Sequence, residues 1–150
     1  MKKILAVVSP GSQVFPMFKA IESEYEIVYL DNADWHFVMS YTHSLSDFVS
    51  RLIEYGADYM VIDTCLRIWV HSDSPVCGQG FQLSEMILEK DPSQKIIGVT
   101  CHVDPIEMEE AYKGHGMVDV IHYYNYRDKS YREDEVRRII SRLKEIEERI

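Results

Sequence analysis

The first apolar run of the chain spans residues 4–8, with the sequence ILAVV, and ends at Ser9-Pro10-Gly11. Apolar residues without alternation predict a strand buried on both faces, as in a parallel sheet. Similar runs recur along the chain, and segments with apolar residues at helical spacing separate them. We expect further strands over 26–30, 59–62, 95–100 and 117–123, and helices over 12–22, 44–56, 81–90, 105–113 and 131–150.

Strands that alternate with helices predict a parallel sheet with helices on both faces. We expect a single α/β domain over residues 1–150, a three-layer (βα)5 flavodoxin-like fold with strand order 2-1-3-4-5. The first and fifth helices should share one face of the sheet. Ligand-binding residues should lie at the carboxyl ends of the strands.

Local signals set the expected ends of the helices. Ser12 is expected to cap the first helix, whose first turn must hold Pro16 because proline lacks an N–H. Gly56 is expected to end the second helix. The last helix should bury a stripe made of Val136, Ile139, Ile140, Leu143, Ile146 and Ile150.

The composition is that of an ordinary folded domain. The chain has 150 residues, of which 46% are hydrophobic and 27% charged, with a net charge of −9. This acidity argues against nucleic-acid or anionic-membrane partners. Residues 127–150 are nearly balanced, with 8 basic and 7 acidic side chains. That balance predicts a last helix laced with ion pairs.

The three cysteines, Cys65, Cys77 and Cys101, cannot all pair within one chain and form no C-x-x-C motif. Free thiols are typical of a reducing compartment, so we expect a cytoplasmic protein. The apolar run 4–8 is too short for a signal-peptide core or a membrane span.

Several chemistry-bearing residues follow the predicted strands. Ser9, Gly11 and Ser12 form a turn before a helix, a place that favours anions. Asp31, Cys65, Cys101 and His102 would line the same edge of the sheet. Cys101 and His102 are neighbours that point to opposite faces, which disfavours a shared zinc ion, and we predict no metal site.

These residues support an alternative hypothesis, in which the chain binds a small molecule or nucleotide at this edge and could be an enzyme. The long connections 33–43 and 66–78 would then form its lid.

Four features resemble the receiver domain of two-component response regulators, over about residues 2–145. Asp63 ends the third strand, where the family keeps its phosphoryl-accepting aspartate. Thr100 ends the fourth strand, at the family's switch position. The sequence Gly80–Leu83 (GFQL) resembles the start of the family's third helix, and 114–120 resembles the approach to its fifth strand.

The chain departs from this family at the groups that support phosphoryl transfer. Val8 and Ser9 stand where receivers keep two metal-binding acids. Tyr124-Asn125 is the nearest match to the family's Lys-Pro pair, and no lysine follows until Lys129. Mg²⁺ normally binds to one or more carboxylates and to water, and Asp63 alone or with Asp31 would make only a weak site for it. The resemblance therefore implies a degenerate pseudo-receiver without a cofactor.

We accordingly expect a stand-alone regulatory domain, without catalytic residues or a DNA-binding segment, that belongs to signal transduction of the two-component type. It would act by protein–protein interaction and would not be phosphorylated. Tyr123, Tyr124 and Tyr126 gather after the fifth strand and are the predicted interface, because tyrosine offers both area and a polar tip. The expected partner is a protein, with a homodimer as the first choice.

Overall fold

The fold is known from a computed structural model that describes residues 1–8, 14–30, 45–64, 79–100, 110, 114–123 and 129–150. A five-stranded sheet has the order β2-β1-β3-β4-β5, and all neighbouring strands are parallel. The strands are β1 (Lys3–Val7), β2 (Glu26–Tyr29), β3 (Tyr59–Asp63), β4 (Lys95–Thr100) and β5 (Asp119–His122). The predicted fold class and strand order are confirmed.

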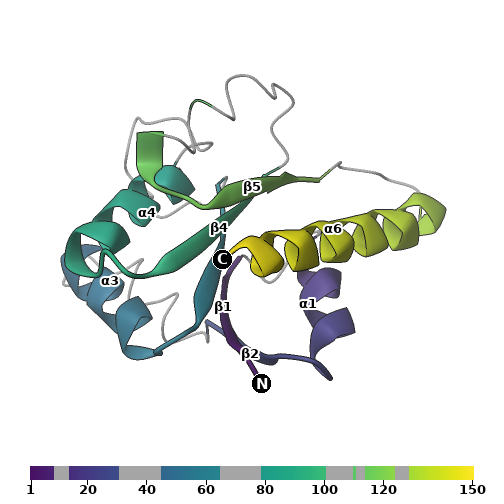
Figure 1. Cartoon of the computed structure of the whole chain (residues 1–150), viewed down its shortest axis with the longest axis horizontal. Coiled ribbons are helices and arrows are strands. Elements are labelled where there is room, and N and C mark those ends of the chain that lie inside the picture. The colour runs from purple at the N-terminus through teal and green to yellow at the C-terminus, as the bar shows by residue number, and fades with distance from the viewer. Residues whose placement is uncertain (9–13, 31–44, 65–78, 101–109, 111–113, 124–128) are drawn as a thin grey trace.

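Helices cover both faces of the sheet (Figure 1). They are α1 (Phe15–Ile21), α3 (Leu45–Glu54), α4 (Gln79–Lys90) and α6 (Lys129–Arg149). In Figure 1, α1 and α6 lie on one face, and α3 and α4 lie on the other. The helix expected over 105–113 lies almost wholly outside the described residues.

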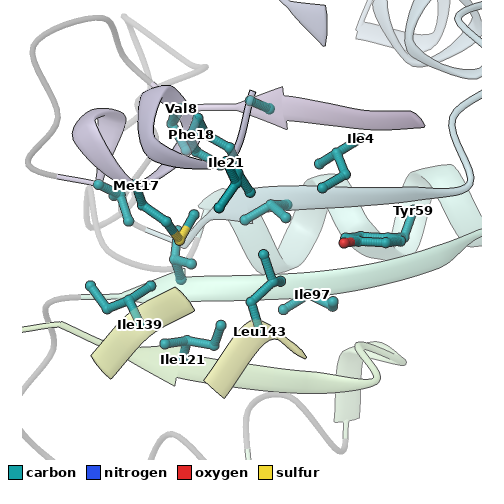
Figure 2. Close-up of a cluster of buried hydrophobic side chains, with 14 of the residues drawn as sticks. Ile4, Val8, Met17, Phe18, Ile21, Tyr59, Ile97, Ile121, Ile139 and Leu143 are labelled. Carbon is teal, nitrogen blue, oxygen red and sulfur yellow. The ribbon is translucent and has the colours of Figure 1, made fainter. Parts of the chain in front are cut away.

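The core has two halves because neighbouring strand residues point to opposite faces. Ile4, Val61 and Ile97 belong to the half under α1 and α6. Leu5 and Met60 belong to the half under α3 and α4. Figure 2 shows the first half, in which side chains of α1 and α6 meet those of the strands. A sheet buried on both faces explains why its strands carry continuous apolar runs.

Two expectations about helix ends were wrong. The first helix begins at Phe15, and Val14 rather than Ser12 occupies the cap position, without a side-chain cap bond. This start places Pro16 in the first turn, where its missing N–H costs nothing. At the other end of the chain, Ile150 follows the last helical residue and is 40% exposed, so it does not extend the buried stripe.

The ion pairs expected along α6 are confirmed. Within the helix, Arg138 pairs with Glu135, and Arg142 pairs with Glu145 at 3.0 Å. Arg142 also reaches Asp119 of β5 at 2.7 Å, so the pairs join the helix to the edge of the sheet. No helix in the described part of the chain is long and apolar enough to cross a membrane.

Candidate functional site

Three strands end side by side at the carboxyl edge of the sheet, and two of them end in buried polar residues. Asp63 closes β3 and is 6% exposed, and Thr100 closes β4 and is fully buried. Asp63 pairs in register with Val99, and Thr100 with His122 of β5. The residues that the resemblance assigns to the phosphoacceptor and switch positions therefore lie on adjacent strands.

The side chain of Asp63 meets that of Tyr123, the first residue after β5. The Tyr123 hydroxyl donates to Oδ2 of Asp63 at 3.4 Å, in buried surroundings. The two residues share a face, because Val61 and Ile121, each two residues earlier, both lie in the half-core under α1 and α6. Thr100 follows Val99 of that same half-core, so strand alternation assigns it to the opposite face.

Tyr123 was predicted as an interface residue, and its burial does not fit that role. Its side chain belongs to the hydrophobic cluster and is 7% exposed, so it offers a partner almost no surface. Its contact with Asp63 was not predicted. The sequence did offer one signal for this contact. Tyr123 stands at the end of the apolar run that forms β5, and the ends of parallel strands meet at the edge of the sheet where Asp63 lies. The structure thus places Tyr123, the first residue after β5, in contact with Asp63. Tyr123 comes one residue before Tyr124, the nearest match to the family's lysine.

The start of α4 packs against the end of β3 through backbone. The N–H of Gly80 donates to the carbonyl of Thr64 at 3.2 Å, and the N–H of Thr64 donates to that of Val99 at 2.9 Å. A Cβ on Gly80 would lie 2.6 Å from Cα of Thr64 and closer still to the carbonyl oxygen of Asp63. Leu83, one turn on, is fully buried. The GFQL sequence therefore fixes the helix against the strand that carries Asp63.

The end of β1 offers no metal ligand at the described positions. Val7 is fully buried under α3 and α4, and Val8 is 3% exposed and packs under α1 and α6. Their side chains are hydrocarbon and cannot bind a divalent ion. Among the residues that the structure describes, no three histidine, cysteine or carboxylate side chains gather into a metal site.

The other predicted site residues lie outside the described residues and stay predictions. They are Ser9, Gly11, Ser12, Asp31, Cys65, Cys101, His102, Tyr124 and Tyr126, together with the connections 33–43 and 66–78.

No family model and no curated protein matches this chain. Several solved structures match it over nearly their whole length. A BeF3-activated DrrB receiver domain aligns over 99% of this chain and 98% of its own, with 16% identity and a TM-score of 0.60. A CheY-like receiver domain protein from Methanospirillum hungatei aligns over 100% and 99%, with 16% identity and a TM-score of 0.57.

A DNA-binding response regulator of the LuxR family from Staphylococcus aureus aligns over 97% of this chain and 98% of its own, with 13% identity and a TM-score of 0.60. The chain has the receiver fold. Sequence identities this low establish the shared fold alone, so function must be argued from the site. In this receiver fold, Asp63 ends β3 as the resemblance implied, and the apolar Val8 follows β1.

Proposed function

We propose that this receiver-fold chain is a regulatory domain that acts through contact with a protein partner and is not phosphorylated at Asp63. The observation that carries the proposal is the contact between Asp63 and Tyr123. The carboxylate is buried and receives the hydroxyl of a tyrosine, on the side where receivers supply a lysine. The position resembles a phosphoacceptor site, but two of the described residues at this edge of the sheet, Tyr123 and Val8, carry no charge.

The chemistry of phosphoryl transfer supports this proposal. Attack of a carboxylate on a phosphoryl group brings negative charges together, and metal ions and cationic side chains offset them. Tyr123 supplies a hydroxyl that is neutral at pH 7, and Val8 supplies no metal ligand. Losing one such electrostatic group typically slows a reaction by roughly 10²–10³-fold. We therefore expect Asp63, with Tyr123 in contact and Val8 at the end of β1, to be a very poor acceptor.

The partner is proposed to be a second copy of this chain, held through Tyr124 and Tyr126, in the cytoplasm. Support comes from the rest of the surface. Among the described residues, the only exposed large hydrophobic side chains are Met1 and Ile150, at the two ends of the chain. The tyrosines after β5 are our first choice for an apolar contact area, because tyrosine offers both area and a polar tip.

A phosphoryl mimic tests the proposal directly. Titration of this chain with a beryllium fluoride complex and Mg²⁺, followed by 1H–15N NMR, should leave the amide signals of Asp63 and Thr64 unmoved. The DrrB receiver domain, which is known in a BeF3-activated form, is the positive control. Saturable shifts at Asp63 and Thr64 that disappear in Asp63→Asn would contradict the proposal.

A further inference from the structure

The end of β5 is held from β4, from β3 and from α6. The N–H of Tyr123 donates to the carbonyl of Thr100 at 2.8 Å. Its hydroxyl donates to Asp63 Oδ2 at 3.4 Å. One residue earlier, the carbonyl of His122 accepts a hydrogen bond from the guanidinium of Arg138. Tyr123 thus spans the end of β4 and joins the two strands on either side of it.

Burial makes the Asp63–Tyr123 contact costly to open. The two residues are 6% and 7% exposed, so water has little access to either polar group. A buried hydroxyl or carboxylate that loses a partner pays for its lost hydration. A tyrosine side chain has two main torsions, so fixing its hydroxyl and its backbone N–H together fixes the residue. These contacts hold Tyr123 at the end of β5.

We infer that Asp63 is a positioning residue: by accepting the Tyr123 hydroxyl, it fixes the end of β5, from which the chain continues to Tyr124 and Tyr126. The inference rests on the proposed function, because those two tyrosines are the proposed partner contacts. A carboxylate at the position of a phosphoacceptor then holds the end of β5 in one permanent conformation.

Amide hydrogen exchange, measured by NMR, reports on this coupling at both ends of β5. The Tyr123 N–H bonds to Thr100 at the end of the strand, and the Val118 N–H bonds to Ile96 at 2.8 Å before its start. Tyr123→Phe removes only the hydroxyl. Asp63→Ala removes the acceptor, and Asp63→Asn keeps an acceptor oxygen of similar size. Tyr25→Phe is the matched control, because Tyr25 donates to Glu147 at the other end of the sheet.

We expect the Tyr123 amide to exchange roughly tenfold faster in Tyr123→Phe and in Asp63→Ala. It should keep the wild-type rate in Asp63→Asn and Tyr25→Phe, and the Val118 amide should be spared in the two fast variants. An unchanged Tyr123 rate in Tyr123→Phe would overturn the inference, and so would equal acceleration at Val118, which indicates global destabilisation. Exchange is read without any phosphodonor, so this result is separate from the test of phosphorylation.

Discussion

The hydroxyl of Tyr25 donates to Oε2 of Glu147 at 2.6 Å and ties α6 to the start of β2. The hydroxyl of Tyr59, at the start of β3, donates to the same oxygen at 3.1 Å, and Nζ of Lys2 lies 3.3 Å from Oε1. Burial and the neighbouring carboxylate raise the pKa of Tyr25 to about 12. This group holds the amino edge of the sheet, opposite Asp63.

Glu147 should make stability depend on acid. Burial raises its pKa, but hydrogen bonds from Tyr25, Lys2 and Tyr59 together outweigh burial, and the net pKa lies below 4.5. A carboxyl whose pKa is lower in the folded state stabilises above its unfolded pKa, and this contribution is lost as the pH falls through the folded pKa. We predict that Glu147→Gln lowers the free energy of unfolding at pH 7 by about 1–2 kcal/mol.

Urea unfolding over a pH series measures this effect. The difference between wild type and Glu147→Gln should shrink as the pH falls from about 4.5 through the lower pKa of the folded-state carboxyl, below which both side chains are uncharged. Glu148→Gln, an exposed neighbour on the same helix, is the control and should follow the wild type. If the difference in free energy of unfolding stayed the same at every pH, the charge of the Glu147 carboxylate would not be what stabilises its contacts with Tyr25 and Tyr59.

Gly80 should tolerate no side chain. A Cβ there would press on the backbone of Asp63 and Thr64, which cannot move as a flexible side chain can. We predict that Gly80→Ala lowers the free energy of unfolding by about 1–3 kcal/mol, the usual range for overpacking. Gly114→Ala is the control, because none of the described residues lies within 4 Å of its added Cβ. Chemical denaturation compares them, and an equal effect of the two changes would refute the close packing of α4 on β3.

The sequence is sufficient for the sheet because burial on both faces leaves a direct mark. The run 95–100 was predicted as a strand and is β4 with the same bounds. The ends of the strands are harder to predict. A strand was expected over 117–123, yet β5 comprises only Asp119–His122. Met117 and Tyr123 are buried without belonging to the strand, so burial alone does not mark where a strand ends. The start of α1 was missed because two rules competed, and the position of Pro16 outweighed the capping preference of Ser12.

The candidate site was predictable in position but not in its contacts. Alternation and strand ends placed Asp63 and Thr100 at one edge of the sheet. The residue that reaches Asp63 is decided by the register of β4 with β5, in which Thr100 pairs with His122. That register is a tertiary property and places Tyr123 over the end of the sheet. The pairing of Glu147 with Tyr25, across 122 residues, is equally invisible to local patterns.

Self-association through the tyrosines after β5 can be tested by sedimentation. We predict that replacing both Tyr124 and Tyr126 with serine lowers the measured mass from that of a dimer to that of a monomer, because the change removes aromatic contact area. Circular dichroism should be unchanged. Ile150→Ser is the control, since it removes an exposed apolar side chain at another place and should leave the mass unaltered. A wild-type monomer would contradict the homodimer.

Intact-mass spectrometry shows whether Asp63 accepts a phosphoryl group. The chain is treated with a small phosphodonor and Mg²⁺, with the DrrB receiver domain as a working control. We predict that the mass of this chain stays unchanged, whereas an added phosphoryl group would raise it by about 80 Da. A phosphorylated species that is absent from Asp63→Asn would contradict it and would mean that other carboxylates, with Asp31 the first to examine, complete a metal site around Asp63.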